Sequence, residues 1–123
     1  MIPFSPLARG YLTRPDEKFA ETRRAKFIDR HDRYSKRIAA YRANGGIEIN
    51  HRVQELAADK DATMAQIALA WLLHQEGVDA PVVGTTSIEH LEDAVEAIDI
   101  SLSSSDLEYL EEPYEPIDVI GHK

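Results

Sequence analysis

Residues 1–13, MIPFSPLARGYLT, decide how the rest of the chain is interpreted. The apolar run at 2–4 predicts a short strand that ends at the polar tip Ser5-Pro6-Leu7, and Gly10 follows in the same loop. A strand end that carries a serine, a proline-fixed turn and a glycine suits a loop that brings backbone amides close to a ligand. Because Ser-Pro is also common in ordinary turns, a plain strand-to-loop turn is the alternative. The chain opens inside this element, so we expect a further segment upstream.

The next part of the chain predicts two amphipathic helices after an irregular stretch at 15–22. In the first helix, from about residue 27, apolar side chains recur at helical spacing, with His31 on the same stripe. The apolar residues of this stripe are Phe27, Tyr34, Ile38 and Tyr41. The sequence Asn44-Gly45-Gly46 is expected to end this helix. The second helix shows the i, i+4, i+7, i+8 pattern and ends near 59–61. Its apolar positions are Ile49, Val53, Leu56 and Ala57.

A third helix begins at Thr63, where Thr63-Met-Ala-Gln66 matches a capping box. Residues 64–73 are apolar around most of the helix circumference, which predicts a helix packed on several sides. Gly77 is expected to stop it.

The last third of the chain predicts one buried strand and two helices. Residues 80–83 form a short apolar run between Asp79 and Gly84, typical of a buried parallel strand. Ser87 is an expected N-cap. The helix after it is expected to bury one apolar face: Leu91, Ala94, Val95 and Ile98. Residues 103–110 predict a short helix started by serines, and the tail is extended from Pro113.

Two short strands separated by helices predict a βαβ arrangement with a right-handed crossover. Two strands alone leave both edges unpaired, and Trp71 with the 64–73 helix would lack a sheet to cover it. The pattern therefore favours a part of a larger parallel sheet.

Composition sets the remaining limits. A chain of 123 residues with 43% apolar residues permits one small globular domain, and the absence of cysteine excludes disulfides and thiolate metal sites. No apolar run approaches the roughly 20 residues that span a bilayer, and no charged-then-apolar stretch precedes a cleavage site, so we expect a cytoplasmic protein without a membrane partner.

The net charge of −8 is unevenly divided. Residues 14–42 hold ten of the fourteen Lys and Arg residues against five acids, and residues from 43 onward hold three against seventeen. A solvated basic helix explains this segment better than a nucleic-acid surface, because acids alternate with the bases and no aromatic stacking motif accompanies them. We expect no nucleic-acid partner.

Three stretches, taken in order, resemble the C-terminal part of the aldo-keto reductase superfamily. They are Ser-Pro-Leu-Ala-Arg-Gly at 5–10, Ala-Gln-Ile-Ala-Leu-Ala-Trp-Leu-Leu at 65–73, and Pro-Val-Val-Gly-Thr-Thr-Ser at 81–87 with the residues up to Asp93. Members of this superfamily are NADPH-dependent (β/α)8 barrels that reduce aldehydes and ketones. The resemblance implies an α/β fold: residues 1–123 would be the seventh and eighth βα units of a TIM-type barrel, with two parallel strands and a mostly helical remainder, the earlier units being absent.

The resemblance also implies a cofactor site for NADP(H). It assigns cofactor contacts to two loops: Phe4, Ser5, Leu7 and Gly10 after the first strand, and Gly84, Thr86, Ser87, His90 and Asp93 after the second. Phe4 stands where the family usually has a tyrosine that stacks on the nicotinamide. Arg9 either lies near the diphosphate or faces solvent. Free amides and the helix dipole at Ser87 favour an anion such as a 2′-phosphate.

The second loop departs from the family pattern. Family members often have Lys or Arg at position 86, Gln or Arg at 90, Glu at 93 and Asn at 94, whereas this chain has Thr86, His90, Asp93 and Ala94. Thr86 supplies no charge for a phosphate, and Ala94 lacks an amide for the adenine. NAD(H) is therefore an alternative cofactor.

The family's catalytic Asp, Tyr, Lys and His lie on the early strands. None of the five tyrosines of this chain lies in a matching motif, and the five histidines show no metal-ligand spacing. The chain alone is therefore predicted to be inactive, with its partners being the nicotinamide cofactor and carbonyl substrate of the intact enzyme and the missing barrel portion. The alternative is a small helical interaction module that docks through the 64–73 face or the basic segment.

Overall fold

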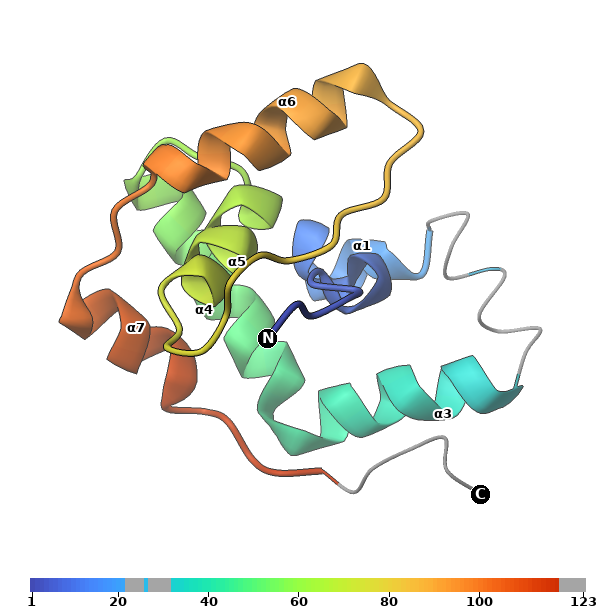
Figure 1. The fold of residues 1–123 in the computed structure, drawn as a ribbon. Coiled ribbons are helices and arrows are strands. Elements are labelled where there is room, and N and C mark those ends of the chain that lie inside the picture. The colour runs from blue at the N-terminus through green and yellow to red at the C-terminus, as the bar shows by residue number, and fades with distance from the viewer. Residues whose placement is uncertain (22–25, 27–31, 118–123) are drawn as a thin grey trace.

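The computed structural model of the protein describes residues 1–21, 26 and 32–117, and their regular structure is almost entirely helical (Figure 1). In chain order the helical elements are η1 (Ala8–Thr13), α1 (Asp16–Phe19), α3 (Asp32–Tyr41), η2 (Arg42–Gly46), α4 (Ile47–Asp59), α5 (Met64–Leu73), α6 (Ile88–Glu96), η3 (Ala97–Asp99) and α7 (Ser104–Glu111). The β structure in these residues is a single parallel bridge between Phe4 and Val82.

The main core lies between α4 and α5, because the apolar stripes of these two helices face each other. Val53, Leu56 and Ala57 from α4 meet Met64, Ile67 and Ala70 from α5, and Leu102 and Leu110 close the cluster. Ile67 and Ala70 are fully buried. Helix α5 also contacts η1, α6 and η3, so the prediction that it is packed on several sides is confirmed. Its apolar face is therefore used inside the chain, and the docking role that the alternative hypothesis gave to it is wrong.

The helix starts follow the predicted caps. Thr63 and Gln66 form the capping box, with Gln66 N donating to Thr63 Oγ1 at 3.1 Å and Thr63 N to Gln66 Oε1 at 3.0 Å. Ser103 and Asp106 form a second box at α7. Such caps satisfy first-turn amides that have no helical carbonyl to bond.

The junction between α3 and α4 differs from the expected helix end at Asn44-Gly45-Gly46. A π-helical turn, η2, carries the chain directly into α4 with a kink at Asn44 and Gly45. Gly45 has a φ of +87°, and a Cβ there would lie 2.0 Å from the Pro113 carbonyl oxygen. The turn therefore requires glycine both for its backbone conformation and for close contact with the C-terminal tail.

Two further predictions in the N-terminal third have different outcomes. The stretch predicted to be irregular contains α1, whose residue Phe19 is buried against Tyr11 and Ile38. A short helix forms there because tertiary burial of Phe19 outweighs weak local periodicity. Phe27 and His31 lie outside the described residues.

The predicted buried face of the helix after Ser87 is wrong for its three large residues and holds only in part, for Ala94. Leu91 is 47% exposed, Val95 58% and Ile98 70%, whereas the small residue Ala97 is buried and Ala94 is partly buried. Helix α6 lies across α5 on this small-residue side, where Gln66 Nε2 donates to the Asp93 carbonyl at 3.1 Å. The larger apolar side chains lie on an adjoining side, and no described element covers it.

The predicted strands at 2–4 and 80–83 are parallel neighbours, but they form one bridge rather than a ladder. The Val82 amide donates to the Pro3 carbonyl at 2.8 Å, and the Asp79 amide to the Met1 carbonyl at 2.9 Å. Phe4 is 77% exposed and Val82 54%. Two short strands without further sheet neighbours rarely form regular structure, so the described residues do not display the predicted barrel.

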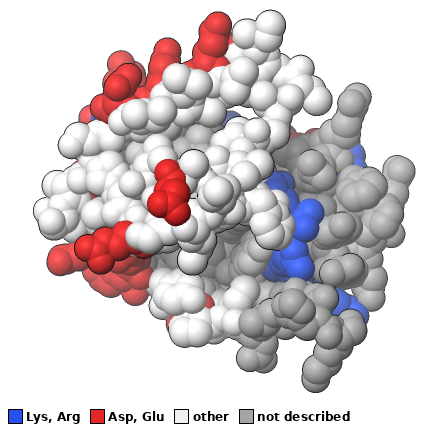
Figure 2. Space-filling view, in the orientation of Figure 1, with Lys and Arg blue, Asp and Glu red and all other residues white. Residues whose placement is uncertain are grey.

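Charge is separated over the surface in the way that the composition predicts. Figure 2 shows acidic side chains over α6 and α7 and basic side chains toward the α3 side of the same face. Among the described residues, no helix is long and apolar enough to cross a bilayer.

Candidate functional site

The loop after the first strand, residues 5–10, has an unusual backbone. Ser5, Ala8, Arg9 and Gly10 all have positive φ angles, of 51°, 52°, 58° and 92°. For residues with a Cβ this conformation costs about 1–2 kcal/mol each, so the surrounding structure must hold the loop. Two amides stabilise it from within: Ala8 N donates to the Ser5 carbonyl at 3.1 Å and Gly10 N to the Leu7 carbonyl at 3.0 Å.

The loop after the second strand, residues 84–87, leads into α6. Ser87 N donates to Thr85 Oγ1 at 3.1 Å, and His90 N donates to Ser87 Oγ at 3.4 Å. Ser87 is therefore the N-cap that the sequence predicted. The amides of Ile88 and Glu89 lie in the first turn, where the helix itself offers them no carbonyl.

The two loops leave the parallel bridge in the same direction. Ser5 directly follows Phe4, and Gly84 comes two residues after its bridge partner Val82. Both residues are exposed. Because the carboxyl ends of parallel strands lie at one edge of a sheet, the bridge brings the starts of the two predicted cofactor loops together.

The other predicted cofactor residues differ in how exposed they are. Leu7 and Gly10 are partly buried in the first loop, whereas Thr86 and His90 are exposed. The chain after Val83 moves away from the N-terminal segment before α6 begins (Figure 1). The bridge alone therefore does not bring Thr86, Ser87, His90 and Asp93 against the first loop.

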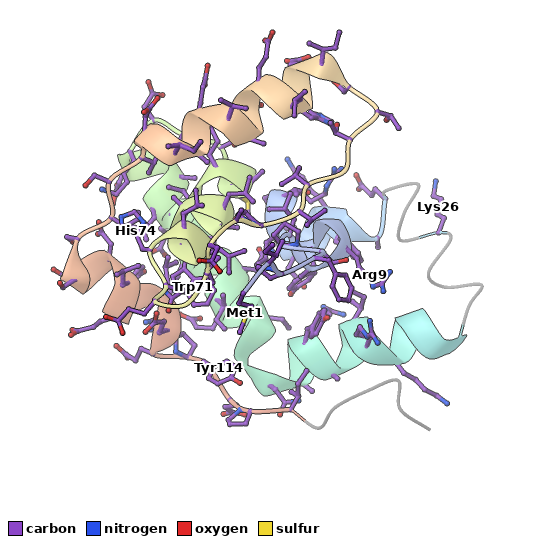
Figure 3. The ribbon with its side chains drawn as sticks, viewed as in Figure 1. Met1, Arg9, Lys26, Trp71, His74 and Tyr114 are labelled. Atoms are coloured by element: carbon purple, nitrogen blue, oxygen red, sulfur yellow. The ribbon has the colours of Figure 1, made fainter. Side chains whose placement is uncertain are left out.

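Figure 3 shows Arg9 between the N-terminal loop and α3. Arg9 is partly buried and has interactions within the chain. The simple alternative in which Arg9 only faces solvent is therefore wrong.

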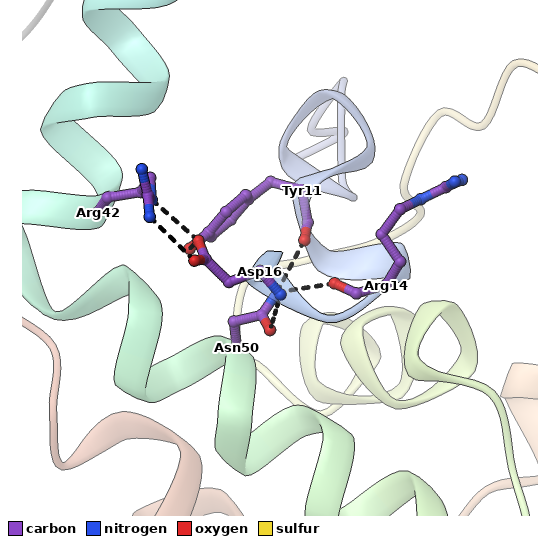
Figure 4. A network of polar contacts seen from close by, with 5 residues as sticks. All are labelled: Tyr11, Arg14, Asp16, Arg42 and Asn50. Atoms are coloured by element: carbon purple, nitrogen blue, oxygen red, sulfur yellow. Dashed lines mark hydrogen bonds and ion pairs between the residues drawn. The ribbon is translucent and has the colours of Figure 1, made fainter. Parts of the chain in front are cut away.

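A polar network that sequence reasoning missed fixes the far end of the first loop (Figure 4). Asn50 of α4 is fully buried. Its Nδ2 donates to the Tyr11 carbonyl at 3.0 Å and to the Arg14 carbonyl at 2.9 Å, and its Oδ1 accepts from Asp16 N at 2.9 Å. The signal was present in the sequence, because Asn50 shares the buried face of Val53 and Ala57 at i, i+3 and i+7.

Tyr11, Asp16 and Arg42 complete the network. Tyr11 Oη donates to Asp16 Oδ1 at 2.6 Å, and Arg42 binds the same carboxylate through Nε and Nη2, each at 3.0 Å. The Tyr11 ring also makes an edge contact with Phe19, at 5.5 Å between centroids. The segment after the loop is therefore held by both apolar and charged contacts.

The electrostatics of this network show what Tyr11 can do. Burial, followed by the hydrogen bond to Asp16, raises the pKa of Tyr11 well above its ordinary value. Burial opposes ionisation of Asp16, but the hydrogen bonds from Tyr11 and Arg42 outweigh it and lower the pKa of that carboxyl. Tyr11, buried and bonded to Asp16, therefore holds the segment after the loop in place.

The histidines give no metal centre among the described residues, which hold no group of three or more His, Cys, Asp or Glu residues able to ligate a metal. His74, at the end of α5 (Figure 3), lies with Nδ1 2.7 Å from the Ala70 carbonyl, while Leu102 N donates to Nε2 at 3.3 Å. These partners fit one neutral tautomer, so His74 is an exposed histidine whose two ring nitrogens both have hydrogen-bond partners in the chain.

Known proteins match this chain over most of its length. The model of the aldo/keto reductase family matches residues 1–115. A Schizosaccharomyces pombe protein named as a candidate aryl-alcohol dehydrogenase is 44% identical over 98% of this chain, which covers 32% of that relative. Versiconal hemiacetal acetate reductase of Aspergillus parasiticus is 34% identical over 94% of this chain, which covers 32% of that protein.

The chain thus spans about a third of the length of these relatives. The match extends from the strained N-terminal loop, through α5, to α6 and α7. The chain belongs to the aldo/keto reductase family.

Proposed function

We propose that this chain is the C-terminal cofactor-binding portion, the seventh and eighth βα units, of an NADP(H)-dependent aldo-keto reductase that reduces aldehydes or ketones. The intact enzyme would consist of this portion and the earlier barrel units. The chain itself contributes none of the catalytic Asp, Tyr, Lys and His. The cofactor, when bound, supplies the hydride; the residues of this chain bind and orient it.

The observation that carries the proposal is the parallel bridge between Phe4 and Val82. It aligns two strand ends whose following loops both lie in stretches that resemble the family, although the second loop departs from the family pattern at positions 86, 90, 93 and 94. In (β/α)8 enzymes, the loops after strands seven and eight at the carboxyl face often bind phosphate. The strained loop at 5–10 supports this role, because backbone held at positive φ collects at ligand-binding sites.

Each predicted residue has a chemical part in this proposal. Phe4, whose ring is exposed, offers a flat apolar surface to the nicotinamide. Ser5, Leu7, Gly10 and Gly84 provide hydroxyl or closely approachable backbone for the pyrophosphate. Ser87 and the first turn of α6 favour the 2′-phosphate. Thr86, His90 and Asp93 contribute polar side chains around the adenosine end. Without a cation at position 86, NAD(H) competes with NADP(H).

The exposed apolar side chains support an assembly with the earlier barrel units. Met1, Ile2, Phe4 and Val82 are exposed at the bridge, and Ile88, Leu91 and Val95 of α6 and Ile98 of η3 are also exposed. Contiguous apolar surface on a small chain marks a contact site. In a closed barrel, both edges of this strand pair would be covered.

The proposal is tested by NMR titration of the 15N-labelled chain with NADPH, because weak binding to a 13.8 kDa chain is still resolved residue by residue. We expect saturable shifts of the amide signals of residues 5–10 and 84–90, and no shifts in α7. Titration with 2′,5′-ADP and with AMP separates recognition of the 2′-phosphate from recognition of the adenosine. Shifts absent from both loops at millimolar NADPH would contradict the proposal.

A further inference from the structure

We infer that Asn50 is a positioning residue, which sets the conformation of the cofactor loop at 5–10 by holding the backbone just after it. This inference rests on the proposed function and adds to it a residue on α4, a helix outside both predicted cofactor loops. Asn50 is not expected to touch the cofactor. It acts through the carbonyl groups of Tyr11 and Arg14.

The loop needs anchors at both ends. Four of its residues have positive φ, and a strained loop keeps one shape only when its surroundings determine that shape. The bridge at Phe4 fixes the first end. The second end has no strand partner, so another element must hold it.

Asn50 is suited to be that second anchor. All three of its side-chain hydrogen bonds go to one short segment, to Tyr11 O, Arg14 O and Asp16 N, at 2.9–3.0 Å. These bonds use both amide hydrogens and the amide oxygen, a combination that neither Asp nor Leu can provide. Because Asn50 is fully buried, each bond forms away from competing water.

The position of Asn50 on α4 makes the anchor rigid. Val53, one turn later, belongs to the main core, and α4 is also packed on α5 and α7. An apolar residue at position 50 would satisfy the core but would leave two carbonyls and one amide of the segment without their partner. The buried amide therefore specifies where the loop ends rather than adding to the apolar core.

The test compares Asn50→Asp with two control variants by NADPH titration of the full chain. Asn44→Asp is the matched control, because Asn44 Nδ2 donates to the Ala40 carbonyl at 2.8 Å, which is a bond inside the helical junction and not to the loop. Val53→Ala is the stability control, because Val53 is buried in the main apolar core of the same helix and its side chain forms no hydrogen bond to the segment at 11–16. We expect Asn50→Asp to raise the Kd for NADPH about tenfold or more, whereas both controls keep the Kd of the unmodified chain.

A second readout reports loop shape without cofactor. Three-bond HN–Hα couplings measure φ at Ala8 and Arg9, and we expect them to change in Asn50→Asp and to stay unchanged in Val53→Ala even though its melting temperature falls. If Asn50→Asp does not fold, Asn50→Ser, which keeps one donor, replaces it. In the unmodified chain the Asn50 side-chain NH₂ signals should shift on NADPH binding, and those of Asn44 should not.

The outcomes separate the two proposals. If the unmodified chain binds NADPH through residues 5–10 and the Asn50 variant binds equally well with unchanged couplings, the positioning role is overturned and the proposed function stands. If the unmodified chain does not bind NADPH, the proposed function and this inference both fall.

Discussion

Phe4 and Val82 pair in parallel, although six of the nine described helical elements lie between them in the sequence. This one contact turns two short apolar runs into neighbouring strand ends. The loops that follow them carry the residues that the family resemblance assigns to the cofactor.

We predict that the purified chain does not reduce common aldehydes with NADPH. The family's catalytic residues belong to earlier strands, and loss of a positioned acid lowers rates by about 10²–10⁴-fold. The decrease in NADPH absorbance at a fixed aldehyde concentration measures the rate of reduction. Addition of the preceding segment of the Schizosaccharomyces pombe relative should restore turnover if the two portions assemble. Turnover by the chain alone, from an expression host lacking contaminating reductases, would count against the proposal.

We predict that Thr86→Arg improves binding of NADPH more than binding of NADH. Only NADPH carries the 2′-phosphate, and an added Arg–phosphate contact is worth about 1–3 kcal/mol. Thr86 is exposed, so the larger side chain needs no repacking. Fluorescence titrations of both cofactors give the ratio of dissociation constants. Thr86→Gln, long but neutral, is the control; an equal gain for NADH would place position 86 away from the 2′-phosphate.

We predict that Asp16 gives the chain an acid-dependent stability. The pKa of Asp16 is lower in the folded chain than in the unfolded chain, where it has its ordinary value of about 3.9. The stability that the ionised Asp16 carboxylate contributes is therefore fully present above that ordinary value, and it is lost as the pH falls through the lowered folded value. Asp16→Asn should therefore flatten the fall in unfolding free energy below about pH 4. Urea denaturation at several pH values measures it. An unchanged slope would show that Asp16 does not carry the effect.

A companion prediction concerns the buried phenol. Tyr11→Phe removes the 2.6 Å hydrogen bond to Asp16 but keeps the ring against Phe19, so it should cost about 1–2 kcal/mol at neutral pH. Because the pKa of Tyr11 is raised in the folded chain, its phenol ionises more easily in the unfolded chain, so the free energy of unfolding falls as the pH rises above the ordinary tyrosine pKa near 10. Tyr11→Phe should lose part of this fall in stability at alkaline pH. Urea denaturation at neutral and alkaline pH measures both effects. Equal stability of the two chains would contradict this account.

We predict that the isolated chain self-associates through the exposed face of α6. Val95→Lys should shift the sedimentation-velocity distribution toward monomer and lower dye binding, because Val95 is 58% exposed and its loss removes no core contact. Glu92→Gln changes the net charge by the same amount on the same helix and leaves the apolar face intact. If the unmodified chain is monodisperse and binds no dye, this surface does not mediate self-association.

Local sequence signals determined much of what the structure contains. The capping residues Thr63, Ser87 and Ser103 and the apolar spacing of α4 predicted where helices begin and which face of α4 is buried, because caps and periodicity act within one or two turns. Resemblance in three ordered stretches predicted the family.

Tertiary structure alone decided the rest. Burial of Phe19 made a helix where local periodicity was weak. Ala94 of α6 and Ala97 of η3, rather than the larger apolar residues, became the more buried side of this segment. The partners of Asn50 lie 34–39 positions away in the sequence. Which distant carbonyls meet a buried amide, and which side of a helix finds a neighbour, depends on the packing of whole elements, and no local pattern encodes that packing.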